Sequence, residues 1–335
     1  MRWAILGAGN IANKFAENLK QVENSKIVSI ASRSSDKLKE FSKNYNIEKD
    51  NCYSNYEDIL KSNFDIAYVG LINNLHEEII DFLSKNKKNI LSEKPAFLNL
   101  AAFKKKIEFI KKQKIFFMES MMYLHHPQTN KIFEIIKNNE IGEIYKFEYK
   151  LGFDIRKKFL NIYKKKIDFL SRLTDPRLGG GAINDIGCYP ISFSNKLANL
   201  FTENKVKELI CFGKIGLTGV DEHADAKIIY DNKFEAKLTV SINKKQDCLA
   251  IVYGSKGKLL IPDLITPKKN YSIIVKAKKE NVYNFFGDDL YTYIIKDVQN
   301  YILNRVCEPN KNGLDWSEMY KNIEMLDDWK AQVFK

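Results

Sequence analysis

The chain opens with Arg2-Trp-Ala-Ile-Leu-Gly-Ala-Gly-Asn-Ile-Ala12, a stretch that predicts a strand, a tight turn and the start of a helix. The apolar run before Gly7 is typical of a buried strand, and residues 13–20 can continue as a helix with one apolar face. Gly7 permits a sharp bend, and Gly9 lets the backbone approach a pyrophosphate without a Cβ in the way. The helix N-terminus then offers free amides and a partial positive charge. The spacing of the small residues therefore predicts a dinucleotide-binding turn.

The end of the second predicted strand, 26–31, indicates which dinucleotide to expect. It is followed by Ser32-Arg33-Ser34, where an NAD-binding unit usually carries Asp or Glu. An acidic residue there bonds the ribose 2′-hydroxyl, whereas Arg33 and its serines offer donors and positive charge to a 2′-phosphate. We therefore expect NADP(H) to be preferred, with NAD(H) as the alternative cofactor. The competing interpretation is that Arg33 is a solvated loop residue.

Composition narrows the class of protein. The chain has 335 residues, of which 44% are hydrophobic, and this is enough for two domains. It has no 18-residue apolar run and no signal-peptide pattern, so we expect a cytoplasmic protein with no membrane partner. Five cysteines without CxxC spacing and only four histidines predict neither a disulfide framework nor a metal site. The net charge is +12, but the lysines are spread over the whole chain and interleaved with acidic residues, which argues against nucleic-acid binding. The denser basic run at 156–166 could attract an anionic substrate.

The hydrophobic pattern predicts an α/β fold with two domains. Strand and helix patterns alternate up to about residue 122, which is the signature of a doubly wound parallel sheet. Beyond it, aromatic and aliphatic residues alternate with polar ones at 145–153 and 234–242, as in an antiparallel sheet with one covered face. We therefore expect a Rossmann domain over 1–122 and a substrate-binding and dimerisation α/β domain over 123–335, with a large, mostly antiparallel open sheet. Ligands should bind at the carboxyl ends of the parallel strands.

Two further stretches carry residues suited to catalysis. Lys94 lies between Glu93 and Pro95 after a predicted strand, and the proline restricts the Lys94 backbone to extended forms. The stretch 178–190 has three glycines before an apolar segment, in which Asp185 and Tyr189 would share a face if that segment is helical. Each residue also has a structural interpretation: Lys94 as part of a turn that merely ends the strand, Asp185 as a helix cap and Tyr189 as a core aromatic.

These pieces occur together, and with them the chain resembles the Gfo/Idh/MocA oxidoreductases. The matching stretches, in the order of that family, are 7–12, 31–34, 73–76, 93–95, 119–128, 175–190 and 219–222. Tyr189 follows Gly-Cys, which resembles the branch of dimeric dihydrodiol dehydrogenase, NADP-dependent D-xylose dehydrogenase and glucose–fructose oxidoreductase; other branches carry His there. The chain departs from the family pattern at Ile72, where the family commonly has Pro, and at Leu124-His125, where it commonly has Arg-Phe. His125 could replace the lost donor or be an ordinary polar residue.

The resemblance implies a cofactor site and an oligomer. Residues implied to line the pyrophosphate are Gly7, Gly9, Asn10 and Ile11, and those implied to hold the adenosine ribose and its phosphate are Ser32 and Arg33. Those implied to border the nicotinamide side are Leu71, Asn73, His76, Glu93 and Lys94. The exposed face of the C-terminal sheet is implied to form a homodimer or a dimer of dimers, and the alternation at 145–153 is compatible with this.

The expected activity is hydride transfer between NADP(H) and a hydroxyl-bearing carbon of a sugar, polyol or sugar derivative. Free Tyr has a pKa of about 10, and a neighbouring ammonium lowers it towards neutrality. We therefore expect Tyr189 to be the general acid/base, Lys94 its electrostatic partner and Asp185 the group that orients a substrate hydroxyl. Candidate substrate contacts are Arg156, Tyr163 and Arg172. The alternatives are an enzyme for a sugar nucleotide or phosphosugar, and an NADP-binding regulatory protein or redox sensor without turnover.

Overall fold

The computed structural model describes residues 1–155, 157–158, 165–166 and 171–335 of the chain, with side chains left undescribed at 157–158 and 165–166. The chain divides into two compact units. The first comprises 1–126 and 288–320, and the second comprises 127–287 and 321–335. Among the described residues, no helix is both long and apolar enough to span a membrane.

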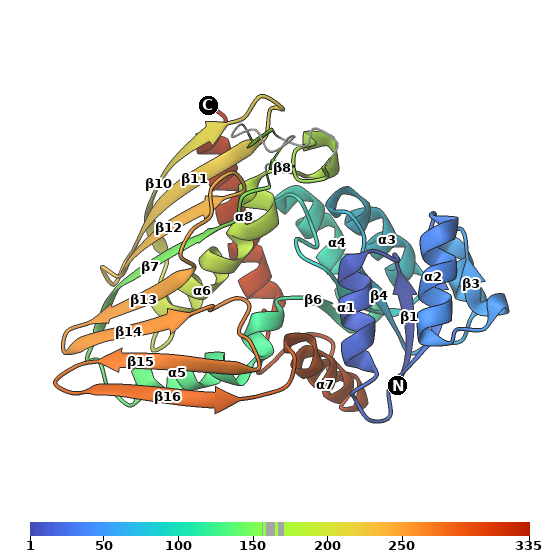
Figure 1. The fold of residues 1–335 in the computed structure, drawn as a ribbon, viewed down its shortest axis with the longest axis horizontal. Coiled ribbons are helices and arrows are strands. Elements are labelled where there is room, and N and C mark those ends of the chain that lie inside the picture. Colours follow the sequence, from blue (N-terminus) through green and yellow to red (C-terminus); the bar gives the residue numbers. More distant parts are fainter. Residues whose placement is uncertain (156, 159–164, 167–170) are drawn as a thin grey trace. The chain divides into compact units, whose positions relative to one another are not determined.

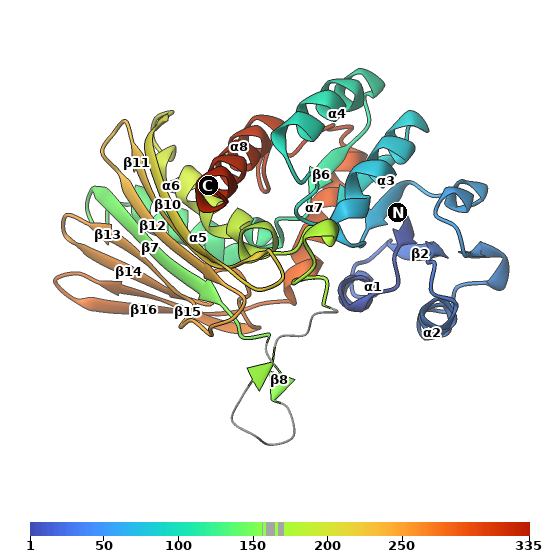
Figure 2. The same ribbon diagram turned by 90° about the horizontal axis from the view of Figure 1, so that it is seen from above.

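The first unit is built on a parallel six-stranded sheet, as predicted. Its order is β3-β2-β1-β4-β5-β6. The strands are β1 (Arg2–Leu6), β2 (Lys26–Ala31), β3 (Cys52–Tyr53), β4 (Ile66–Val69), β5 (Asn89–Ser92) and β6 (Phe117–Glu119). The helices between them are α1 (Asn10–Leu19), α2 (Ser35–Tyr45), α3 (Asn73–Lys85) and α4 (Leu100–Gln113), with 3₁₀ turns at Lys49–Asn51, Glu57–Lys61 and Met122–His125. Figure 2 shows α1 and α2 on one side of this sheet and α3 and α4 on the other.

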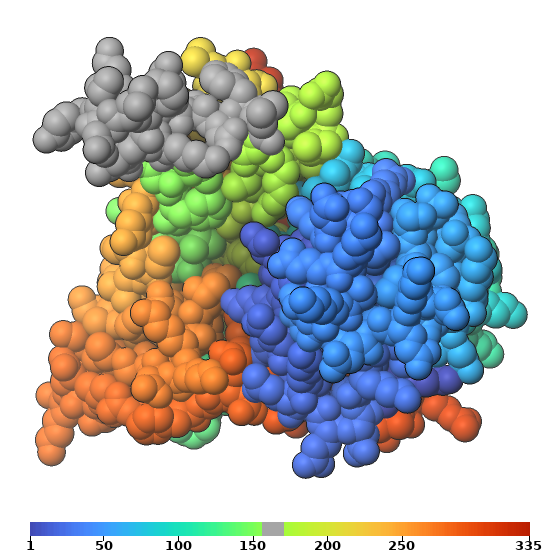
Figure 3. Space-filling model, turned by 45° about the vertical axis from the view of Figure 1, so that its right-hand side comes forward, coloured from blue at the N-terminus to red at the C-terminus, as the bar shows by residue number. Residues whose placement is uncertain are grey.

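The strands of this unit are buried because both faces of the sheet are covered. All four residues of β4 are buried, and this matches the continuous apolar run at 66–71. Two helices begin at side-chain caps, since Ser34 accepts the Lys37 amide of α2 and Asn99 accepts the Ala102 amide of α4. In Figure 3 the residues from the first fifth of the chain, in dark to mid blue, form one continuous part of the surface.

A late segment of the chain completes the first unit. Helix α7 (Leu290–Leu303) packs against α1, and the Thr292 hydroxyl donates to Asn18 Oδ1 at 2.9 Å. The Trp316 indole N–H donates to the Phe117 carbonyl of β6 at 3.1 Å. The predicted domains divide the chain once, after residue 122, whereas the compact units also assign 288–320 to the first part. The boundary at 122 stays a prediction.

The second unit contains an eight-stranded, mostly antiparallel sheet, as predicted, in the order β10-β11-β12-β7-β13-β14-β15-β16 (Figure 1). Only the pair β7 and β12 is parallel. The strands are β7 (Ile144–Gly152), β10 (Val206–Ile215), β11 (Asp221–Tyr230), β12 (Glu235–Ser241), β13 (Leu249–Gly254), β14 (Gly257–Pro262), β15 (Asn270–Lys276) and β16 (Glu280–Phe286). The helices are α5 (Pro127–Lys137), α6 (Cys188–Ala198) and most of α8 (Trp316–Val333), and the short strands β8 (Lys157–Lys158) and β9 (Lys165–Lys166) pair with each other.

The aromatic alternation in β7 faces inward. Phe147 and Tyr149 are buried, and the Phe147 ring lies 5.3 Å from that of Phe193 on α6. The alternation therefore contributes to the core of the second unit, and Tyr145 at the start of the strand is its exposed member.

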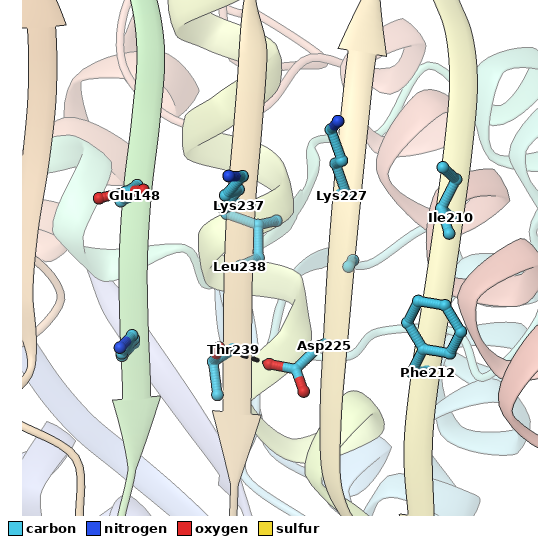
Figure 4. Close-up of a pocket in the computed structure, with 10 residues that line it drawn as sticks. Glu148, Ile210, Phe212, Asp225, Lys227, Lys237, Leu238 and Thr239 are labelled. Carbon is cyan, nitrogen blue, oxygen red and sulfur yellow. Dashed lines mark hydrogen bonds between the residues drawn. The ribbon is translucent and has the colours of Figure 1, made fainter.

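The opposite face of this sheet is charged over β7, β11 and β12, whereas Ile251, Leu260 and Ile274 occupy it on β13, β14 and β15. Figure 4 shows Glu148, Lys237 and Lys227 there, in a row that the strand register continues to Ile210. Glu148 lies 2.6 Å from the Lys146 ammonium of the same strand, which neutralises its charge, and it accepts the Tyr253 hydroxyl from the neighbouring strand β13.

Candidate active site

The carboxyl ends of the parallel strands form one edge of the first unit. The register aligns one row of strand-end residues: Ala31, Leu6, Val69, Ser92 and Glu119. The predicted cofactor-binding residues follow four of these ends: Gly7, Gly9, Asn10 and Ile11 after β1, Ser32 and Arg33 after β2, Leu71, Asn73 and His76 after β4, and Glu93 and Lys94 after β5. The fold therefore brings them to the edge where such sheets bind ligands.

The turn after β1 fits a pyrophosphate. Gly7 has a φ of +101°, and a Cβ there would collide with the Gly70 carbonyl oxygen. A Cβ on Gly9 would meet nothing within 4 Å, so the backbone at the start of α1 is open on that side. No side chain caps α1 and its first turn holds no acidic residue, which leaves its first amides and its positive dipole end for an anion.

The turn after β2 holds Arg33 in place. The guanidinium lies 4.9 Å from the centre of the Tyr56 ring, and the rest of the side chain is exposed. Burial raises the pKa of Tyr56, although Arg33 opposes this through its charge and through a hydrogen bond from its backbone. Ser32 is buried and accepts the Ser34 amide at 3.4 Å. An ordered, exposed cation beside two serines suits a 2′-phosphate.

The segment after β5 is held first through the side chain of Glu93. This carboxylate is buried, and its Oε1 accepts the Tyr68 hydroxyl at 2.8 Å and the Tyr291 hydroxyl at 3.0 Å. Burial and then the charge of Glu93 raise the pKa of both tyrosines well above its usual value. Both tyrosines therefore stay protonated and keep donating. Glu93, predicted to border the nicotinamide, has its carboxylate engaged in the core.

The same segment is held a second time through its backbone. The ring of His76 lies with Nδ1 2.8 Å from the Pro95 carbonyl oxygen and Nε2 3.1 Å from that of Leu71. Burial lowers the pKa of His76, although both carbonyl contacts oppose this. The Ala96 amide donates to Glu119 Oε1 at 2.8 Å. His76 thus joins α3 to the strand ends, and its contacts are structural.

Lys94 is the one residue of 91–97 whose side chain is not buried. Its neighbours on both sides are fixed by the contacts of Glu93, Pro95 and Ala96. A backbone held this firmly restricts where the ammonium can reach, which is what an electrostatic role in catalysis requires.

The second unit carries Asp185 and Tyr189 on consecutive helical turns. Residues Ile183–Gly187 form a π-helical turn that leads into α6, and Pro190 is the third residue of α6. The sequence pattern predicts a helix here but not the π turn, which is a feature often found at functional sites. Asp185 is nearly buried, and its Oδ1 lies 3.1 Å from Arg172 Nη1, whose side chain is 47% exposed.

Asp221 anchors the glycine stretch before this helix. Its Oδ2 accepts the Ile183 amide at 2.7 Å, and Gly181, with a φ of +106°, leaves room for the carboxylate because a Cβ would collide with it. Sequence reasoning placed 219–222 in the family resemblance but missed this role, and it also missed Tyr68, Tyr291 and Glu119. Arg156 and Tyr163 lie outside the described residues.

His125 belongs to the pair Leu124-His125, which stands where the family has Arg-Phe. Its side chain is buried and faces α7. Its Nδ1 lies 2.7 Å from Asp297 Oδ2, which also accepts the Asn312 side-chain amide at 2.8 Å. His125 is therefore an ordinary structural polar residue within the first unit.

Comparison with known proteins decides the family. The profile described as "Oxidoreductase family, NAD-binding Rossmann fold" matches residues 1–120, and the GFO/IDH/MocA C-terminal domain matches 129–260. A Xenopus tropicalis protein named trans-1,2-dihydrobenzene-1,2-diol dehydrogenase is 31% identical over 335 residues, covering 96% of this chain and 95% of its own. The chain belongs to the Gfo/Idh/MocA oxidoreductase family.

Solved structures agree with this fold. A 3-ketoreductase from Actinomadura kijaniata, crystallised with NADP and TDP-benzene, has a TM-score of 0.86 and 21% identity, covering 99% of this chain and 98% of its own. An aldose-aldose oxidoreductase from Caulobacter crescentus has a TM-score of 0.86 and 16% identity, covering 99% and 97%. The Gfo/Idh/MocA resemblance is confirmed, and this chain is an oxidoreductase with an NAD(P)-binding Rossmann domain.

The structural role of His125 makes stability depend on pH in a defined direction. Burial raises the pKa of Asp297, but the hydrogen bonds from His125 and Asn312 and the charges of His125 and Lys311 together outweigh burial and lower it from its usual value. We expect Asp297→Asn to reduce the free energy of unfolding by about 1–3 kcal/mol at neutral pH. The loss should shrink as the pH falls below about 4, because the unfolded state then takes up a proton on Asp297 more readily than the folded state does.

Urea unfolding of both proteins between about pH 3 and pH 7 measures this difference. Asp288→Asn is the matched control, since its pair with Lys296 is half exposed and should contribute little. An equal loss at both ends of the pH range would contradict the assignment.

Proposed function

We propose that this chain is an NADP(H)-dependent dehydrogenase that acts on a hydroxyl-bearing carbon of a sugar, polyol or related diol. The observation that carries the proposal is the clamped segment 93–96, which fixes Lys94 at the same sheet edge as the open glycine turn. The near full-length relative named as a diol dehydrogenase supports the same reaction class.

The cofactor would be held by the residues that follow β1, β2, β4 and β5. The amides at Gly9, Asn10 and Ile11 would bind the pyrophosphate, and Arg33 with Ser32 would bind the 2′-phosphate side. When bound, the nicotinamide supplies or accepts the hydride. NADP(H) preference rests on Arg33, which is exposed and ordered by Tyr56.

Tyr189, Lys94 and Asp185 would carry the proton and the charge. The substrate oxygen must lose or gain a proton as hydride moves, and the Tyr189 hydroxyl would exchange it. The Lys94 ammonium would stabilise the negative charge on that oxygen or on the phenolate. Asp185, paired with Arg172, would orient a second substrate hydroxyl. Lys94 belongs to the first unit and the other two residues to the second, so their joint action is part of the proposal.

Turnover tests this assignment. Purified protein is screened with NADP⁺ and NADPH against aldoses, uronates, inositols, trans-dihydrodiols and sugar nucleotides by absorbance of the nicotinamide. We expect Tyr189→Phe and Lys94→Ala each to reduce kcat by about 10²–10⁴-fold while NADPH still binds. Tyr283→Phe, which loses only a hydrogen bond to Glu140, is the matched control and should keep full activity.

The outcome separates the alternative functions. Binding of NADPH without turnover of any substrate would favour a redox sensor over an enzyme. Turnover confined to sugar nucleotides or phosphosugars would favour the anionic substrate class, to which the exposed guanidinium of Arg172 could contribute. Near-full activity of Tyr189→Phe would show that another group is the acid/base.

Cofactor preference gives a separate prediction. Arg33→Ala should weaken NADPH binding by about 10–100-fold, because it removes a charge-assisted hydrogen bond, and should leave NADH binding unchanged. Fluorescence titration measures both dissociation constants. Lys43→Ala, at the far end of α2, is the control for a general loss of positive charge. An equal effect on both cofactors would contradict the 2′-phosphate role.

We also propose that the outer face of the second unit's sheet forms a homodimer. Phe212 is 69% exposed on β10, lines a pocket over β7, β10, β11 and β12, and offers an apolar anchor among the charged pairs (Figure 4). Phe212→Glu should therefore give a monomer in light-scattering mass measurements. Phe286→Glu, also exposed (84%) but on β16 at the opposite edge, should leave the mass unchanged. A monomeric wild-type protein would refute the proposal.

A further inference from the structure

Glu119 is a buried carboxyl group that the proposed reaction does not use. It ends β6, is 2% exposed, and is aligned with Ser92 at the end of β5. Its Oε1 accepts the Ala96 amide at 2.8 Å. Its Oε2 is buried and has no hydrogen-bond partner among the described residues. A buried acid with one satisfied and one unsatisfied oxygen calls for a physical explanation.

The groups around Glu119 connect it to Lys94. The charged side chains that act on it are Lys94, which stabilises its carboxylate, and Glu93, which opposes it. The Ala96 amide also favours the carboxylate, but burial is the largest effect and raises the pKa of Glu119 to about 7. Glu119 therefore changes charge near neutral pH, next to a segment that is otherwise locked.

We propose that Glu119 is a positioning residue for Lys94, which it serves by holding the backbone at Ala96 and by setting the electrostatic field at the ammonium through gain or loss of one proton. The hydrogen bond from Ala96 is made to Oε1 in both protonation states, so the backbone stays in place. The ionised form attracts the ammonium, and the protonated form does not. Only the kinetic consequence rests on the proposed function.

Glu119→Gln separates the two parts of this role. The amide oxygen can still accept the Ala96 amide, but the side chain stays neutral at every pH. Because the pKa of Glu119 is raised in the folded state, the native protein binds the proton more tightly and loses stability as the pH rises from about 5 to about 8. We expect the Tm of the wild type to fall relative to Glu119→Gln over that range. Glu108→Gln, an exposed acid on α4, should follow the wild type.

The kinetic readout concerns the pH profile of kcat/KM. We expect a wild-type inflection near pH 7 that Glu119→Gln abolishes, with NADPH affinity retained. A Tm difference that does not vary with pH would overturn the proposal, and so would an inflection that persists in the variant. If no substrate is turned over, the proposed function fails, while the stability measurement still tests Glu119.

A second variant keeps the test independent of how Glu119→Gln folds. The protonated carboxyl of Glu119 has its own infrared band, which is titrated in the wild type and in Lys94→Met. Removing the attractive ammonium should move this titration to higher pH. An unchanged titration would show that Glu119 and Lys94 do not interact, and would overturn the proposal.

Discussion

The two hydroxyl groups that converge on Glu93 are the interaction on which the first unit depends. Tyr68 comes from β4 and Tyr291 from α7, so one carboxylate oxygen joins the parallel sheet to a segment 198 positions later in the chain. A buried carboxylate is costly unless it is hydrogen-bonded, and removing either donor would leave it undersatisfied. The same contact explains why 288–320 belongs to this unit, and it fixes the backbone from which Lys94 projects.

The parts of the fold that could be predicted are those that depend on the spacing of apolar residues and glycines within a short stretch of sequence. The glycine turn, the buried strands and the helix at 316–333 follow from spacing that neighbouring residues reveal. β3 has only two residues, too few to show an alternation of apolar and polar side chains. β16 is an exposed edge strand without a buried face. Both lack the signal on which such prediction rests.

The candidate site was predictable in its residues but not in its contacts. Lys94, Asp185 and Tyr189 were identifiable because they stand in motifs. The partners Tyr68 and Tyr291 stand in none, and Asp221 stands in the stretch 219–222 without a contact that the sequence reveals. Tertiary pairing alone shows the role of all three. The inward aromatics of β7 show the converse, because alternation reveals that a strand has two faces without revealing which one is covered.

The two units use one device to support their functional residues. In each, a buried carboxylate accepts a backbone amide two positions from such a residue: Glu119 from Ala96, after Lys94, and Asp221 from Ile183, before Asp185. Burial raises both pKa values, to about 7 and about 6, so the ionised form of each acid is less stable here than in water. Each acid fixes the position of a backbone amide, because a carboxylate held by its strand can keep a loop N–H at one point. A loop held in this way can present a flexible side chain without letting its backbone move.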